Sequence, residues 1–374
     1  MVPLKSWLWP DTSVGPVGHW IQFRDRHVIG TYSGRSAVAL ACKLLGIGPG
    51  HDVLFPAYNC GTELDAVEFS GAQTVGYRVS KSGEIALEDL VARRSSRTKA
   101  VYVIHYFGWE QSLGELRRWC DNHGLLLIED CALSLFSHGA NGSIGRVGDA
   151  AIFSLPKTLG IYHGGFLTLS RSPATTPLLH PAGSRVLAKE CRISMRRSVY
   201  TSFEYLGFES RLLSTDRLDS TKPSGQFPDM PASYYFNATV HADRRIHPRA
   251  NSVAESVSPE EIVKIRRDNY SFLAPVLQAT RKIELLYPSL PIGVCPLAFP
   301  IITPDRDKYV FLLKKKNIEV SRWWAGFCQK GIDWAQFPEA SWLKRNIITL
   351  PIHQDIDEQR LNYLAASISE IFSS

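Results

Sequence analysis

The sequence predicts an α/β protein, with a mostly parallel central sheet in a large domain and a smaller C-terminal α/β domain. Three observations predict this class. Between residues 31 and 170, apolar strand-like segments alternate with helix-like segments. The strand-like segments are continuous apolar runs, such as AVYVIHYFG at 100–108, which indicates burial on both faces. A chain of 374 residues is also too long for one small core. We therefore expect a large domain at 1–255 and a small domain at 256–374.

The composition is that of an ordinary globular protein, with 44% hydrophobic and 21% charged residues. A net charge of +6 suits an anionic ligand, but no dense basic stripe argues for nucleic acid. The seven cysteines are scattered without a CxxC pair, which favours a reducing compartment over disulfides or a metal site. No apolar run reaches membrane-spanning length and the N-terminus lacks signal-peptide features, so we expect a cytoplasmic protein without a membrane segment.

The first 30 residues, rich in Trp, Pro and Gly, predict an irregular arm. A helix is expected within 31–50, because apolar residues from Ala37 to Leu45 recur at helical spacing and Gly46 ends the pattern. Apolar runs predict the strands, and amphipathic patterns predict the other helices. Strands are expected at 52–57, 74–79, 100–108, 125–130, 150–155 and 166–170; helices are expected at 62–70, 85–94 and 112–124.

Residues 171–255 break this alternation and are dense in Pro, Ser and Arg. We interpret them as an ordered, irregular excursion, because exposing aromatic residues such as Phe227 and Tyr234 would be costly. The C-terminal part resumes regular patterns. Helices are expected there at 260–278, 305–317 and 357–371, and strands at 295–302, 318–322 and 347–350.

Polar groups follow several of the predicted strands. Asp130 ends one apolar run, Lys157 comes just past the next, and His105 ends a third. In parallel sheets ligands bind beyond the carboxyl ends of the strands, so these groups are expected at one edge. A buried acid and a single reactive amine suit pyridoxal phosphate (PLP), whose aldehyde takes a lysine and whose ring nitrogen takes an acid. Each residue also has a purely structural interpretation: a helix cap, a surface lysine, a buried histidine.

The entry to the first helix is a candidate anion site. Ser33 and Gly34 supply a tight turn, so the free amides near Arg35 and Ser36 point out of the helix N-terminus. Taken alone, this pattern is also an ordinary helix cap.

Five segments together resemble a known family. SGRSAVALACKLLGIGPGHDVLFPAYNC, AVYVIHYFG, HGLLLIEDCA, GDAAIFSLPKTLG followed by GGFLTLS, and ITLPIH are similar in order and spacing to the DegT/DnrJ/EryC1/StrS family of PLP-dependent fold-type I aminotransferases. The resemblance implies that Lys157 is the Schiff-base lysine and that Asp130 pairs with the pyridine nitrogen. It also implies further cofactor and substrate contacts. These are the phosphate turn Gly34, Arg35 and Ser36, the hydroxyl of Ser154, stacking by Tyr58, and low-ranked substrate contacts from His105 and His353.

The resemblance further implies transfer of an amino group from an amino acid such as glutamate to a keto-sugar nucleotide or related keto substrate, for polysaccharide or natural-product synthesis. A homodimer is expected, since family sites are built across two subunits. Two departures stand out: Leu133 replaces a residue that contacts the cofactor in relatives, and the run before Lys157 is shortened to SLPK. Two alternatives therefore stay open, a PLP-dependent sugar dehydratase and a catalytically silent binding or regulatory protein.

Overall fold

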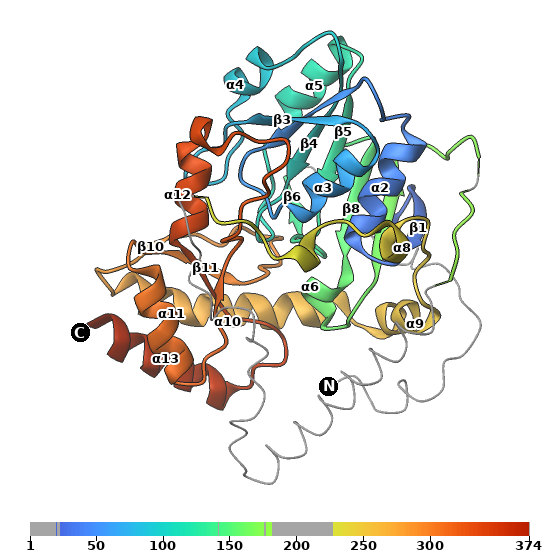
Figure 1. Ribbon diagram of the computed structural model, residues 1–374. Coiled ribbons are helices and arrows are strands. Elements are labelled where there is room, and N and C mark those ends of the chain that lie inside the picture. Colours follow the sequence, from blue (N-terminus) through green and yellow to red (C-terminus); the bar gives the residue numbers. More distant parts are fainter. Residues whose placement is uncertain (1–19, 21–22, 141, 176, 182–226, 374) are drawn as a thin grey trace.

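A seven-stranded sheet forms the centre of the larger part of the molecule (Figure 1). The computed structural model describes residue 20 and residues 23–140, 142–175, 177–181 and 227–373. The strand order is β1-β9-β8-β5-β4-β2-β3. The strands are β1 (His27–Thr31), β2 (Asp52–Pro56), β3 (Gln73–Tyr77), β4 (Thr98–Ile104), β5 (Leu126–Asp130), β8 (Ala150–Ser154) and β9 (Gly165–Leu169). Only β9 runs against its neighbours, so the predicted, mostly parallel α/β class is confirmed.

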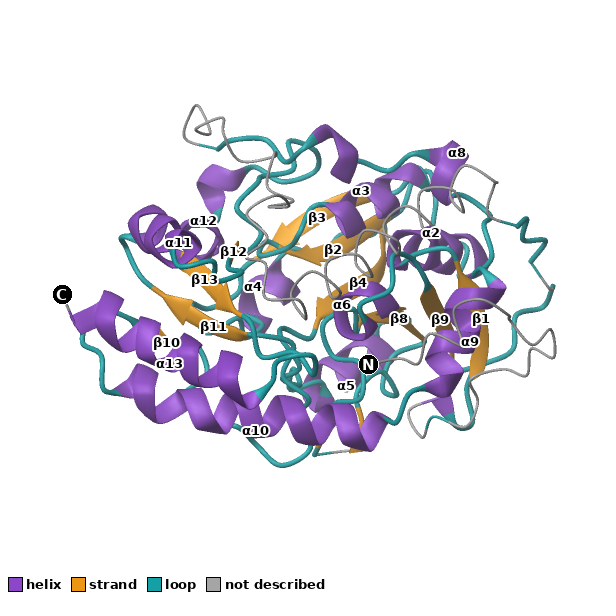
Figure 2. Cartoon of the chain, turned by 90° about the horizontal axis from the view of Figure 1, so that it is seen from below, coloured by secondary structure: helices purple, strands orange, loops and turns teal. Residues whose placement is uncertain are grey.

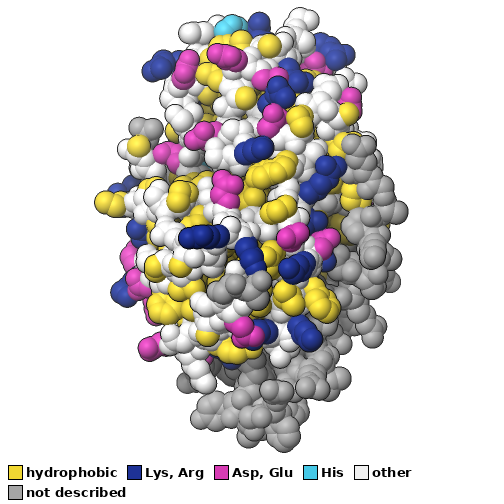
Figure 3. Space-filling model, turned by 90° about the vertical axis from the view of Figure 1, so that its left-hand side faces the viewer, with side chains coloured by type: hydrophobic (Ala, Val, Ile, Leu, Met, Phe, Trp, Pro, Cys, Tyr) yellow, Lys and Arg dark blue, Asp and Glu magenta, His cyan; other side chains and the backbone are white. Residues whose placement is uncertain are grey.

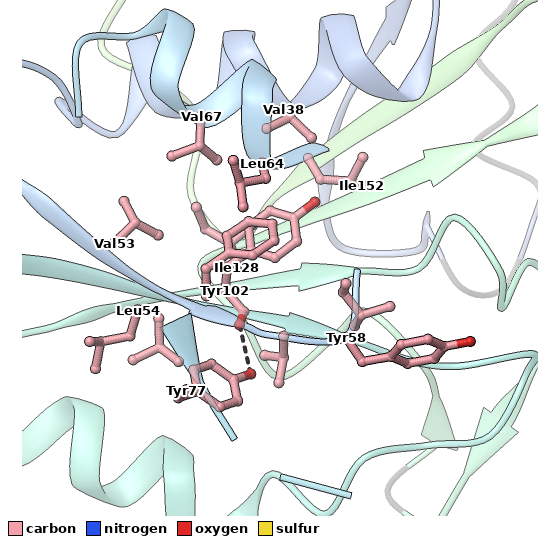
Figure 4. Packing of buried hydrophobic residues seen from close by; sticks show 14 of the residues in the cluster. Val38, Val53, Leu54, Tyr58, Leu64, Val67, Tyr77, Tyr102, Ile128 and Ile152 are labelled. Carbon is pink, nitrogen blue, oxygen red and sulfur yellow. Dashed lines mark hydrogen bonds between the residues drawn. The ribbon is translucent and has the colours of Figure 1, made fainter. Parts of the chain in front are cut away.

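Helices cover both faces of this sheet. The helices α2 and α3 pack together above Val53, while Leu54, the next residue of β2, points to the opposite face with Tyr77 (Figure 4). This alternation buries both faces of the strand, as its continuous apolar run predicts. The helices of this part are α2 (Gly34–Leu44), α3 (Thr62–Phe69), α4 (Leu87–Ala92), α5 (Gly114–Asn122), α6 (Leu155–Leu159), α8 (Ala238–His241) and α9 (Pro248–Ser256). A 3-10 turn, η2 (Ala232–Tyr234), and a short hairpin, β6 (His138–Gly139) with β7 (Gly142–Ser143), complete it.

A separate antiparallel sheet of four strands lies in the C-terminal part, in the order β10-β11-β13-β12. Its strands are β10 (Glu284–Leu285), β11 (Phe299–Ile302), β12 (Ser321–Arg322) and β13 (Ile347–Leu350). Its helices are α10 (Pro259–Gln278), α11 (Arg306–Lys315), α12 (Pro338–Asn346) and α13 (Glu358–Ser373), with the 3-10 turn η3 (Trp334–Gln336). Figure 2 shows α10 extending along one side of the molecule, past both sheets. A domain boundary near residue 255 stays a prediction; in this structure it falls at the end of α9.

The segment before α2 is more regular than the predicted arm. Residues 27–31 form β1, which pairs along its full length with β9. Just before β1, Trp20 and Phe23 are buried against aromatic rings. The ring centroid of Phe23 lies 5.0 Å from that of Phe153 on β8, and the centroid of Trp20 lies 4.9 Å from that of Phe136 in the loop after β5. Residues 1–19 of the expected arm and 182–226 of the expected excursion lie outside the described residues.

Charges of both signs are interspersed with apolar side chains on the face shown in Figure 3. Within the described part of the chain, no helix is long and apolar enough to cross a membrane.

Candidate active site

The acid at the end of β5 is buried. Asp130 is 6% exposed, its Oδ2 accepts a hydrogen bond from the Tyr102 hydroxyl at 2.8 Å, and its Oδ1 accepts from the Ala132 amide at 2.9 Å. Burial, followed by repulsion from Glu63, raises the pKa of Asp130 to about 6, although both hydrogen bonds and Lys157 act in the opposite direction. A carboxylate held this way is ionised at neutral pH and favours a nearby cation.

The lysine follows β8 directly. Lys157 lies in the one-turn helix α6, and its half-buried side chain places Nζ 5.4 Å from the ring centroid of Trp323 and 5.8 Å from that of Trp324. Among the described residues, no carboxylate forms an ion pair with this amine. Burial raises the pKa of both Asp130 and Cys60, and the charge of Lys157 opposes this rise in both, so the amine lies near the edge of the sheet where these groups lie. The shortened SLPK run thus still brings the amine to that edge.

The N-terminus of α2 meets the ends of β8 and β9. Ser33 caps the helix, and its Oγ accepts from the Ser36 amide at 3.2 Å. A β-carbon on Gly34 would lie 3.7 Å from the Ser154 hydroxyl oxygen. A β-carbon on Gly165 would lie 2.6 Å from the Ser33 carbonyl carbon, so only glycine allows the strand to approach the helix this closely. The Arg35 side chain turns away, donating to the carbonyl of Tyr234 at 3.1 Å.

These residues fit PLP by the chemistry of their donors. The first amides of an eleven-residue helix and the Ser154 hydroxyl form a cradle for a phosphate. Lys157 offers an amine to an aldehyde, and Asp130 offers a buried carboxylate to a protonated ring nitrogen. The cofactor roles assigned from sequence therefore converge on one edge of the sheet, and they stay proposals.

Tyr58 lies in a cluster of rings near the lysine. We call Tyr58, Tyr106, Trp323 and Trp324 the aromatic wall; neighbouring ring centroids are 5.1 to 5.9 Å apart. Tyr58 is 1% exposed, and its hydroxyl has no hydrogen-bond partner among the described residues. Burial raises its pKa well above the ordinary value. Stacking of Tyr58 on a cofactor stays a prediction.

Trp324 has a strained backbone. Its φ is 51°, in the left-handed region that side-chain-bearing residues seldom adopt. Strain of this kind persists where surrounding contacts enforce it, and it concentrates at functional sites.

His105 has both ring nitrogens occupied. It is fully buried; Nδ1 accepts from the Gln111 amide at 3.0 Å, so the proton sits on Nε2, which lies 3.0 Å from Glu129 Oε2. Burial opposes the charge on Glu129, but hydrogen bonds from His105 and the Gly148 amide outweigh it and lower the Glu129 pKa. This geometry agrees with the interpretation of His105 as a buried structural histidine, because neither ring nitrogen is free to contact a substrate.

His353 lies in the loop after β13, with its Nδ1 3.7 Å from Asp355 Oδ2. The next residue, Gln354, donates to the carbonyl of Thr158 at 3.0 Å, so this loop borders the turn that carries Lys157. A substrate contact by His353 stays a prediction.

Two buried, positively charged side chains near the site were not predicted from the sequence. Lys344 on α12 is fully buried and donates to the carbonyls of Asn59 at 2.6 Å, Gly326 at 2.9 Å and Trp324 at 3.2 Å. Burial lowers its pKa to about 8. Arg266 on α10 is the second. The sequence pattern gives no sign that either side chain is buried. Lysine and arginine are seldom buried without a counter-ion, so both would be expected at the surface.

The fold and the site define a class: a fold-type I aminotransferase. The structure resembles a DegT DnrJ EryC1 StrS aminotransferase from Brucella abortus, with a TM-score of 0.69 and 19% identity over 96% of this chain and 88% of that one. It resembles S. venezuelae DesV in complex with a ketimine intermediate to the same degree. The family model for the DegT/DnrJ/EryC1/StrS aminotransferase family matches residues 22–212, just over half of the chain. The chain belongs to this PLP-dependent family.

Two relatives illustrate the sequence similarity. A "Pleiotropic regulatory protein" of Geobacillus stearothermophilus is 22% identical over 361 residues, covering 93% of this chain and 86% of its own. A "GDP-perosamine synthase" of Vibrio cholerae is 31% identical over 145 residues, covering 38% of this chain and 40% of its own. The match to that enzyme therefore spans about two fifths of its length.

Proposed function

We propose that this protein is a PLP-dependent aminotransferase that moves an amino group from an amino acid, such as glutamate, to a keto-sugar nucleotide or related keto substrate. One observation carries the proposal: Asp130, Lys157 and the α2 N-terminus meet at the same edge of the sheet. The similarity to GDP-perosamine synthase and to a UDP-N-acetyl-3-dehydro-alpha-D-glucosamine 3-aminotransferase supports a sugar acceptor.

Each residue has a role in this chemistry. The amides of Gly34 and Arg35, with the hydroxyls of Ser36 and Ser154, hold the phosphate at the positive end of the helix. Asp130, whose pKa of about 6 leaves it ionised at neutral pH, keeps a proton on the ring nitrogen. Tyr102 orients that carboxylate by donating to Oδ2.

Lys157 would hold the cofactor's aldehyde carbon, and its free amine would be the base for the proton transfers. When bound, pyridoxal phosphate supplies an electron sink for the pair left by the broken C–H bond. The Lys157 amine would take the proton from the donor's α carbon, and in the second half of the transfer it would deliver a proton to the acceptor carbon that receives the amine. The rings of Trp323 and Trp324 lie beside this amine, with centroids 5.4 and 5.8 Å from Nζ.

Assembly and location follow from the same proposal. We expect a homodimer, as the family's sites are built across subunits. All six cysteines among the described residues are free thiols, which suits the reducing cytoplasm.

The test is amino transfer with the purified protein. Wild type plus PLP, glutamate and a panel of keto-sugar nucleotides should give many turnovers of 2-oxoglutarate per site, and Lys157→Ala should give none. Turnover by Lys157→Ala at the wild-type rate would disprove the assigned chemistry.

A catalytically silent regulatory protein is the second candidate. The long alignment with the Geobacillus regulatory protein favours it, and so does Leu133, which is 2% exposed and packs in the core cluster. PLP binding without any turnover on the whole acceptor panel would support this candidate over the first.

A further inference from the structure

A buried arginine lies beneath the turn that carries Lys157. Arg266 is 2% exposed, and among the described residues no carboxylate forms an ion pair with it. Its Nε donates to Gln354 Oε1 at 2.9 Å, its Nη1 to the carbonyls of Leu297 at 2.8 Å and Pro296 at 3.2 Å, and its Nη2 to the carbonyl of Thr158 at 3.1 Å. All four acceptors are neutral oxygens. Burying a charge this way is costly, so the arrangement calls for a reason beyond packing.

The Thr158 carbonyl accepts two hydrogen bonds, one from Arg266 and one from Gln354. Arg266 donates at 3.1 Å, and the Gln354 side-chain amide donates at 3.0 Å. Thr158 belongs to α6, a helix of five residues that ends at the left-handed Gly160. The last carbonyls of a helix have no partner inside it, and one turn is too short to be stable alone. The two outside donors therefore hold the residue next to Lys157.

Both donors come from the C-terminal part of the chain. Arg266 lies on α10, and Gln354 lies in the loop after β13. Arg266 also joins these segments to each other, because its Nε donates to Gln354. A shift of α10 or of this loop would move Thr158 and, with it, the backbone of Lys157.

We infer that Arg266, together with Gln354, is a positioning residue that fixes the Lys157 turn and makes the direction of its amine depend on docking of the C-terminal segments. The inference rests on the proposed function, in which Lys157 is the reacting amine. We call Arg266 and Gln354 the clamp. The inference predicts that loosening the clamp slows the lysine chemistry while the N-terminus of α2, which is a separate element, stays intact.

Three variants separate positioning from general docking. Arg266→Met and Gln354→Leu each remove a donor to Thr158. Arg267→Met is the matched control: Arg267 is the next residue of α10, and its Nη1 donates to the carbonyls of Pro291 at 2.7 Å and Val294 at 2.8 Å without reaching α6. Like Arg266→Met, the Arg267→Met variant removes arginine hydrogen bonds to backbone carbonyls of residues 291–297, but it leaves Thr158 untouched.

The first readout needs no cofactor. Amide hydrogen exchange of a peptide spanning residues 155–160 should be about tenfold faster in Arg266→Met and Gln354→Leu, the effect of losing one or two buried hydrogen bonds. It should match wild type in Arg267→Met. Equal exchange in all three variants and wild type would overturn the inference. Should Arg266→Met fail to fold, Gln354→Leu decides the question alone.

The second readout is kinetic. With PLP, glutamate and a keto-sugar nucleotide that wild type accepts, both clamp variants should lower kcat by at least tenfold while the KM for glutamate changes less than threefold, and Arg266→Lys should recover part of the loss. An equal kcat in Arg267→Met and Arg266→Met would contradict a positioning role. If wild type itself shows no turnover, the proposed function fails, but the exchange experiment still decides whether the clamp holds the turn.

Discussion

Replacing the buried Lys344 by methionine should change how the stability of the protein depends on pH. The Lys344 ammonium satisfies three carbonyl oxygens on two segments, Asn59 on one side and Trp324 and Gly326 on the other. It therefore ties the turn after Tyr58 to the loop that bears Trp324. Burial lowers its pKa from 10.5 to about 8, even though Cys60, Glu63 and Cys328, which face it, act to raise the pKa.

The sign follows from proton linkage. Between pH 8 and 10.5 the unfolded chain binds more protons at this site than the folded one, so wild-type stability rises with pH across this window. A difference of about 2.5 pH units at about 1.4 kcal/mol each corresponds to roughly 3 kcal/mol. The stability of wild type relative to Lys344→Met should therefore increase by roughly this amount from pH 7.5 to pH 10.5, and it should be flat below pH 7.

Urea denaturation at a series of pH values measures this difference directly, because titrations elsewhere in the chain cancel between the two proteins. Lys330→Met is a useful contrast: its hydrogen bond to Asp65 raises the Lys330 pKa, so its curve should show no such rise. A flat difference for Lys344→Met, or one that falls with pH, would refute the conclusion that burial lowers the pKa of Lys344.

Three further outcomes follow from the site. Asp130→Asn should lower kcat by at least 100-fold in glutamate turnover assays while PLP still binds, because the amide accepts from Tyr102 but cannot hold a ring proton; a smaller loss would contradict the pairing. Ser154→Ala should weaken PLP affinity about tenfold by equilibrium dialysis, since one hydroxyl beside the α2 N-terminus is lost; unchanged affinity would remove Ser154 from the cradle. His105→Leu should destabilise the fold by about 2–3 kcal/mol in urea denaturation, because it removes the side-chain donor of the buried Glu129 carboxylate and leaves it only the backbone amides of Gly145 and Gly148; full stability with lost glutamate affinity would favour a substrate role instead.

Much of the seven-stranded sheet and its helices could be predicted because continuous apolar strands and glycine-ended helices leave clear local patterns. The sequence alone places Asp130 and Lys157 at one edge, since the carboxyl ends of parallel strands meet there. Strand β1 was not predicted because its five residues alternate weakly and become a strand only by pairing with β9.

The parts of the site that could not be predicted depend on contacts distant in sequence. Lys344 bonds Asn59, 285 residues earlier, and Arg266 bonds Thr158, 108 residues earlier. No local pattern marks either residue as buried, and the usual expectation for a lysine or arginine on a helix is a solvated surface. Trp323 and Trp324 stand out as a pair in the sequence, but their contact with Lys157 depends on the packing of the C-terminal segments onto the sheet.

Reductive trapping tests the central claim most directly. Wild-type protein incubated with PLP, treated with borohydride and digested should carry the fixed cofactor on the peptide containing Lys157, and Lys344→Met should label in the same place. Labelling confined to Lys344 or to surface lysines, with Lys157 unmodified, would contradict the proposal that Lys157 is the reacting amine.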